Sequence, residues 1–145
     1  MVADWVTTSL AVGHLRDTQH VWGPFGLGLT FNSGFAFSLF SGRAVVVTIL
    51  LCLGVTVLAV VVARVRTVPL AIGGGLILGG AVGNLSERIL GGHGGQVPDF
   101  ITLTDWPTFN VADACVTFGV IVVVVVLLFG RREVPPDEVP SAGSS

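Results

Sequence analysis

Residues 44–63 read AVVVTILLCLGVTVLAVVVA, and no charged side chain interrupts this stretch. Its 20 residues are the length that an α-helix needs to cross the roughly 30 Å hydrocarbon core of a bilayer. The valines would also suit a buried strand in water, but in lipid a single segment satisfies its own backbone hydrogen bonds only as a helix. The stretch therefore predicts a transmembrane helix.

Two further uncharged runs follow along the chain. TVPLAIGGGLILGGAVGNLS occupies residues 67–86 and ACVTFGVIVVVVVLLFG occupies residues 114–130, and each is close to the length of a bilayer span. Charged residues make up 11% of the chain and hydrophobic residues 52%, whereas soluble domains carry roughly a quarter charged residues. We therefore expect an all-α membrane protein with three transmembrane helices, rather than a soluble domain or a disordered chain. A net charge of -2 and the lack of a basic tract exclude a nucleic-acid binder.

The arginines predict how these helices are oriented. Arg64 and Arg66 lie between the first and second spans, and Arg131 and Arg132 follow the third. These are four of the seven basic residues, so the positive-inside rule makes their side cytoplasmic.

The same topology divides the chain into three regions. Residues 1–43 form an extracytoplasmic platform, in which VWGPFGLGLTF (21–31) is typical of short extended, β-containing segments. Residues 44–130 are expected to form the transmembrane helical core, with an outward-facing loop at 88–112. Residues 131–145, rich in proline, serine and acidic side chains, are expected to be a disordered cytoplasmic tail.

Polar and ionisable side chains gather at the predicted outer ends of the spans, where such groups are costly and mark function. The group comprises Asn32, Asn84, Glu87, Arg88, Asp99, Asn110 and Asp113. Because the flanking helices are antiparallel, Asp99 and Asp113 can converge at the outer membrane surface. Two close carboxylates cannot both ionise cheaply, so one keeps a proton, and such a pair can activate water as acid and base.

Each of these residues also has a plain structural interpretation. Asp99 follows Pro98 and is typical of a turn, while Asp113 can be a first-turn acid behind Asn110 as the N-cap. His93 stands in a run of glycines and is expected to be only part of a flexible loop. The histidines and cysteines lack metal-ligand spacing, so we expect no metal or cofactor.

Three separated blocks resemble signal peptidase II, the bacterial lipoprotein signal peptidase of peptidase family A8. They are FNSGFAFSLF (31–40), GGAVGNLSERILGGHGGQVPDFI (79–101) and FNVADACVTFG (109–119). The resemblance implies an aspartic endopeptidase that removes the signal peptide from diacylglyceryl-modified prolipoproteins just before the lipidated cysteine. It also implies a monomeric, multi-pass protein of the bacterial cytoplasmic membrane, in contact with membrane lipids, with its active site facing outward.

The resemblance also assigns roles to residues by matching position. Asp99 and Asp113 resemble the catalytic pair, and the side chains expected to bind the substrate are Asn32, Asn84, Arg88, Asn110, Asp4 and Glu87. Two positions depart from the family: Glu87 stands where aspartate is usual, and Thr8 where lysine is usual.

The start of the chain raises alternatives. The family has four spans, and Met1 falls where the first helix should be ending, so we expect most of that helix to be missing from this chain. A truncated, non-catalytic member that binds lipoprotein precursors is therefore an alternative to the peptidase. A proton-coupled transporter subunit is a third, but it requires charges near mid-span, which these spans lack.

Overall fold

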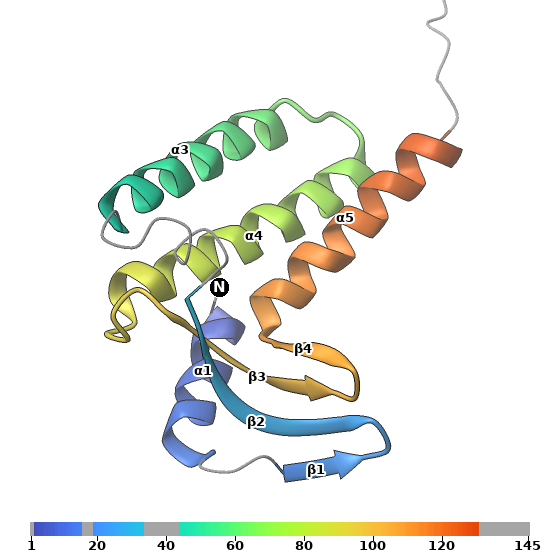
Figure 1. Ribbon diagram of the computed structural model, residues 1–145. Coiled ribbons are helices and arrows are strands. Elements are labelled where there is room, and N and C mark those ends of the chain that lie inside the picture. The colour runs from blue at the N-terminus through green and yellow to red at the C-terminus, as the bar shows by residue number, and fades with distance from the viewer. Residues whose placement is uncertain (1, 16–18, 34–43, 131–145) are drawn as a thin grey trace, which may run out of the picture.

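The computed structural model describes residues 2–15, 19–33 and 44–130. The elements in order are α1 (Val2–His14), β1 (Gln19–Trp22), β2 (Phe25–Asn32), α3 (Ala44–Ala63), α4 (Val68–Leu90), β3 (Val97–Leu103), β4 (Trp106–Phe109) and α5 (Val111–Phe129). Figure 1 shows the three longer helices at one end of the molecule and the sheet, with α1 beside it, at the other. The block that begins FNSGFAF continues beyond the described residues after Ser33, and the expected tail at 131–145 lies outside them as well.

Two helices of the described region, α4 and α5, are long and apolar enough to cross a membrane. Only 22% and 11% of their most apolar stretches are buried inside the protein, so most of their apolar surface is left uncovered by the described part of the chain. This agrees with the prediction of membrane helices. The third helix, α3, is also apolar. Its described side chains cover only Thr48–Ala63, which is shorter than the other two helices, so a third membrane span stays a prediction.

Glycines allow α4 and α5 to pack closely. A Cβ placed on Gly80 would collide with the carbonyl oxygen of Ala112 and approach Val116 Cγ2 to 2.7 Å. A Cβ on Gly119 would lie 2.6 Å from the carbonyl oxygen of Gly73, so the contact is tight at two levels. Small residues let helix backbones approach in this way in lipid, and here they hold the start of α5 against α4.

The sheet is larger than the small β-containing segment that the sequence predicts beside the helices. Its four strands are antiparallel in the order β1-β2-β3-β4, and β2 pairs with β3 so that Thr30 faces Asp99 and Asn32 faces Val97. The extended segments expected at 21–31 are present, but two strands also form within 88–112, which we expected to be a loop. Val97–Leu103 is rich in β-branched and aromatic residues and forms a strand because β2 supplies a partner distant in the sequence.

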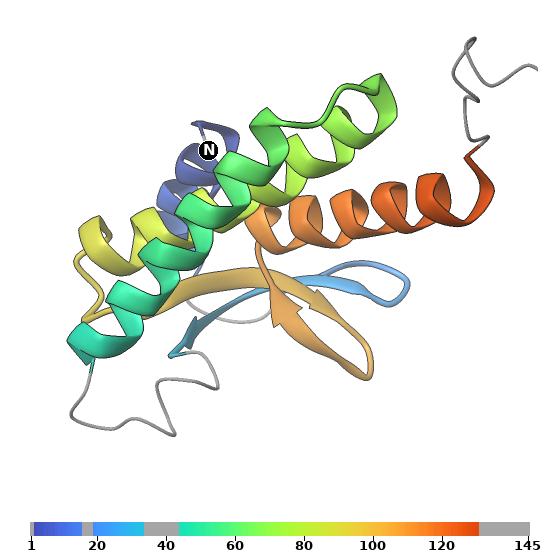
Figure 2. The same ribbon diagram turned by 90° about the horizontal axis from the view of Figure 1, so that it is seen from above.

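The sheet joins directly onto the ends of the long helices. The chain passes from α4 through a short connection into β3, and from β4 straight into α5, so the strands lie beside these two helix ends (Figure 2). Helix α1 packs against β3 and also contacts α4 and α5. Ala11 of α1 and Phe100 of β3 are among the buried apolar side chains of the described region. The end of the molecule where helices and sheet meet is therefore its most enclosed part.

Candidate active site

Five polar side chains meet where the sheet joins the helices. Asn32 ends β2, Asp99 lies in the middle of β3, Asn84 lies in the last two turns of α4, Asn110 is the N-cap of α5, and Asp113 lies in its first turn. Because two of these elements are strands and two are helices, the residues converge only in the folded chain. Asp99 is therefore a strand residue and not the turn residue that its position after Pro98 allowed.

Hydrogen bonds connect the two aspartates through asparagine side chains. Asp99 Oδ2 accepts from Asn32 Nδ2 at 2.9 Å, and Asp99 Oδ1 accepts from Asn110 Nδ2 at 2.9 Å. Asn110 Nδ2 also donates to Asn84 Oδ1 at 3.1 Å, and Asn84 Nδ2 donates to Asp113 Oδ1 at 2.7 Å. Asn110 and Asn84 therefore form a continuous bridge from one carboxylate to the other.

Asn110 combines this bridging role with a helix cap. Its Oδ1 accepts from the backbone N–H of Asp113 at 2.9 Å, and Asp113 Oδ2 accepts from the backbone N–H of Asn110 at 3.4 Å. This reciprocal capping box fixes the amide so that its oxygen faces the helix and its nitrogen faces Asp99 and Asn84. The predicted N-cap is thus confirmed, and it belongs to the same hydrogen-bonded group as the two aspartates.

Burial alters the acidity of Asp99. Its side chain is only 2% exposed, and this desolvation raises the pKa of its carboxyl from 3.8 to about 6. The negative charge of Asp113 raises this pKa as well, while the hydrogen bonds from Asn32 and Asn110 and the charge of Arg88 lower it. Asp99 therefore holds its proton to a higher pH than an ordinary aspartate does.

Arg88 brings positive charge to the same place. Its Nη1 donates to the backbone carbonyl oxygen of Asn84 at 3.3 Å, and its guanidinium attracts both Asp99 and Asp113. It lies on α4, four residues after Asn84 and hence on the same face of the helix. The guanidinium is placed to stabilise negative charge at the carboxylate pair.

Asp4 and Glu87 lie beside this group and do not hydrogen-bond to it. Asp4, 4% exposed, accepts from the backbone N–H of Ala112 at 3.0 Å and so holds the first turn of α5 from the α1 side. Glu87, 6% exposed, is close enough to Asp4 for the two carboxylates to repel each other. Their assignment as substrate-binding residues stays a prediction. The sequence did not indicate that Asp4 would contact α5, because 108 residues separate the partners of this bond.

The fold and this group of side chains are what a membrane aspartic peptidase requires: apolar helices, and at their ends a buried pair of carboxyl groups with amide donors and an arginine. Within the described segments, no three histidine, cysteine or acidic side chains lie where they could hold a metal ion.

Comparison with known proteins identifies the family. Residues 1–129 match the family Signal peptidase (SPase) II, and the chain belongs to this family. It is 38% identical over 137 residues to a lipoprotein signal peptidase of Rhodococcus jostii, and 43% identical over 157 residues to one of Mycolicibacterium smegmatis. These matches cover 90% and 98% of this chain, and 69% and 66% of the two relatives.

Other relatives are longer, and solved structures share the fold. A lipoprotein signal peptidase of Mycobacterium tuberculosis is 43% identical over 106 residues, which cover 70% of this chain and 52% of the relative. The chain thus spans between about half and two thirds of the length of these relatives. A solved bacterial membrane enzyme superposes with a TM-score of 0.78 at 26% identity, covering 90% of this chain and 88% of its own. A second superposes with a TM-score of 0.75, also at 26% identity, covering 88% of this chain and 81% of its own.

Proposed function

We propose that this chain is an aspartic endopeptidase that removes the signal peptide from diacylglyceryl-modified prolipoproteins, cutting just before the lipidated cysteine. Membership of the signal peptidase II family supports the substrate class. The observation that carries the chemistry is the pair of carboxyl groups joined through Asn110 and Asn84, one of them deeply buried.

The raised pKa of Asp99 makes it the acid of the pair and Asp113 the base. Asp113 takes a proton from a water molecule as the water oxygen attacks the scissile carbonyl carbon, and Asp99 gives its proton to the carbonyl oxygen. In the second step the C–N bond breaks, Asp113 passes its proton to the leaving nitrogen, and one hydroxyl of the tetrahedral intermediate returns a proton to Asp99. Both residues regain their starting states, and one water molecule is consumed for each peptide bond.

The surrounding side chains support these steps. Asn110 and Asn84 keep both carboxyl groups in place, because each amide is already committed to fixed partners. The positive charge of Arg88 stabilises the negative charge that the pair carries in every step. We assign Asn32 and Arg88 to the side of the pair that the substrate backbone approaches.

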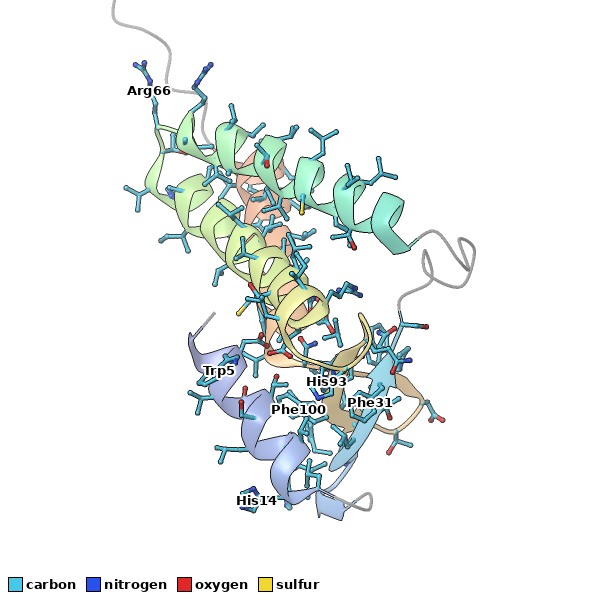
Figure 3. All side chains as sticks on the ribbon, turned by 90° about the vertical axis from the view of Figure 1, so that its left-hand side faces the viewer. Trp5, His14, Phe31, Arg66, His93 and Phe100 are labelled. Carbon is cyan, nitrogen blue, oxygen red and sulfur yellow. The ribbon has the colours of Figure 1, made fainter. Side chains whose placement is uncertain are left out.

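The site is assigned to the outer face of the cytoplasmic membrane. Figure 3 places Arg66 at the end of the helices opposite to the sheet, while Phe31, His93 and Phe100 lie at the sheet end. By the positive-inside rule, the Arg66 end is cytoplasmic and the aspartates face outward. A prolipoprotein has its scissile bond just after a membrane-spanning signal helix, so an outward site at the membrane surface matches the position of that bond.

The test is cleavage of a diacylglyceryl-modified precursor by the purified chain and by its Asp99→Asn and Asp113→Asn variants. Each substitution should lower kcat at least about 1000-fold, because it removes a proton-transfer group. Asp105→Asn is the matched control: Asp105 is an exposed aspartate with a φ of 62°, a conformation that asparagine tolerates well, so activity should persist. Cleavage by either active-site variant would refute the proposal. A wild-type chain that binds the precursor without cutting it would favour a non-catalytic family member instead.

A further inference from the structure

The connection between α4 and β3 carries a single side chain before Gln96. Gly91, Gly92, Gly94 and Gly95 surround His93, and three of these glycines have positive φ angles, of 75°, 62° and 84°. The turn is closed by a hydrogen bond of 3.1 Å from the backbone N–H of Gln96 to the carbonyl oxygen of His93. Because glycine restricts the backbone so little, the imidazole of His93 is the group that can fix this connection.

The imidazole packs against the strand that supports Asp99. Its ring centroid lies 5.2 Å from that of Phe31, with the rings tilted by 41° (Figure 3). Phe31 precedes Asn32, the donor to Asp99, and pairs in the sheet with Pro98, the residue before Asp99. The His93 ring therefore contacts the β2 residue next to Asn32. In the sheet, that residue pairs with the β3 residue next to Asp99.

Glu87 also lies near the imidazole. A Cβ on Gly91 would lie 2.6 Å from Glu87 Oε2 and 3.1 Å from His93 Nδ1, so these two polar atoms share the space beside that glycine. His93 Nδ1 is buried and, among the described residues, has no hydrogen-bond partner. Positive charge on His93 attracts the Glu87 carboxylate, whereas Asp4 repels it.

Among the described residues, His93 is a basic group close to the buried pair of Glu87 and Asp4. The chain contains no lysine. The neighbouring arginine, Arg88, donates to the carbonyl oxygen of Asn84 and attracts Asp99 and Asp113. A buried carboxylate without a nearby cation is costly, and here a second carboxylate adds to the cost. The groups near the imidazole are thus Phe31 of β2 and Glu87 of α4, and Asp4 of α1 acts on Glu87 electrostatically.

We infer that His93, packed on Phe31 and lying near Glu87, is a positioning residue that sets where β3 begins and hence where Asp99 lies. The role of positioning Asp99 rests on the proposed peptidase function. His93 does not touch the reacting atoms, so its loss changes the fraction of correctly placed Asp99 rather than the binding of substrate. Such a residue acts on kcat and leaves KM nearly unchanged.

The experiment is a double-mutant cycle between His93 and Glu87, measured by cleavage kinetics and by unfolding of the purified full chain in detergent micelles. His93→Gln should lower kcat about tenfold, since it removes the imidazole near a buried carboxylate, and KM should change less than about twofold. His93→Phe keeps a ring against Phe31 but loses the ring nitrogens near Glu87, so it should show the same loss. Adding Glu87→Gln to His93→Gln should restore most of the lost kcat, because it removes the uncompensated carboxylate.

His14→Gln is the matched control, because His14 is an exposed histidine on α1 whose ring contacts the carbonyl oxygen of Leu10. It should leave both kinetic constants unchanged. Additive effects of the His93 and Glu87 substitutions, or full activity of His93→Phe, would overturn the inference. If the wild-type chain does not cleave at all, the peptidase proposal fails separately. The His93–Glu87 pair is then judged by unfolding alone, where coupling supports it and additivity overturns it.

Discussion

Replacing Asp99 by asparagine should change how the stability of the protein depends on pH. The native protein holds the Asp99 proton up to a pKa of about 6, while an unfolded aspartate releases it near 3.8. The folded state therefore binds this proton more tightly than the unfolded state does. The stability that Asp99 contributes is fully present below pH 3.8 and is lost as the pH rises through 6.

The magnitude follows from the two pKa values. At about 1.36 kcal/mol for each pKa unit, the interval from 3.8 to about 6 corresponds to roughly 3 kcal/mol of unfolding free energy. Asp99 is 2% exposed, so solvent screening does not reduce this figure. Asparagine has no proton to lose, and its amide meets donors from both Asn32 and Asn110, so its cost is constant with pH.

The assay is denaturant unfolding of the wild type, Asp99→Asn and the control Asp105→Asn in micelles, between about pH 4 and about pH 7. Over this range the wild type and the control should each lose roughly 2.5 kcal/mol relative to Asp99→Asn, since a small part of the roughly 3 kcal/mol is already lost at about pH 4. Acidic groups that do not interact with Asp99 titrate alike in the wild type and in Asp99→Asn, so they cancel in this comparison. Parallel curves for the wild type and Asp99→Asn would refute the claim that burial keeps this carboxyl protonated.

Three further predictions concern the groups around Asp99. Asn110→Ala should lower the unfolding free energy by about 2–4 kcal/mol and kcat at least about 100-fold, because it removes a helix cap and the amide donor to Asp99 and Asn84. Wild-type stability and cleavage rates in this variant would contradict the bridge between the two aspartates. Gly80→Leu should destabilise the protein by about 1–3 kcal/mol and reduce cleavage, because the side chain would be forced against α5. At Gly79 a Cβ meets no atom within 4 Å, so the control Gly79→Leu should change the unfolding free energy little. Equal effects of the two substitutions would exclude close α4–α5 packing as the cause. Asn32→Ala removes a hydrogen-bond donor that favours the ionised form of Asp99, so it raises the pKa of that carboxyl. The alkaline limit of the pH profile of kcat should therefore move upward by about one pH unit. A limit that stays in place or moves downward would contradict this role of Asn32.

Several features could be predicted because they depend on neighbouring residues alone. The apolar runs that became α4 and α5 were visible because the transfer of a helix into lipid depends on the composition of about 20 consecutive residues. The cap formed by Asn110 and Asp113 is equally local, since its partners are three residues apart. The spacing of the family motifs also indicated which aspartates to pair.

Other features could not be read from the chain. β3 was mistaken for part of a loop because its hydrogen-bond partner, β2, lies about 70 residues earlier in the sequence. His93 was expected only to be part of a flexible loop, because its contact with Phe31 comes from β2, a distant element of the chain. The one available signal was that it is the only side chain in a run of glycines.

The amino-acid sequence by itself determined that this chain enters a membrane, where its polar residues concentrate and to which family it is similar. Each of these properties is carried by short segments, and it persists whatever the rest of the chain does. Only the tertiary structure decided that Asp99 lies on a strand, that two asparagines join it to Asp113, and that it keeps its proton to about pH 6. Desolvation and hydrogen bonding between distant segments arise when the chain is folded, and the acidity of a carboxyl group depends on both.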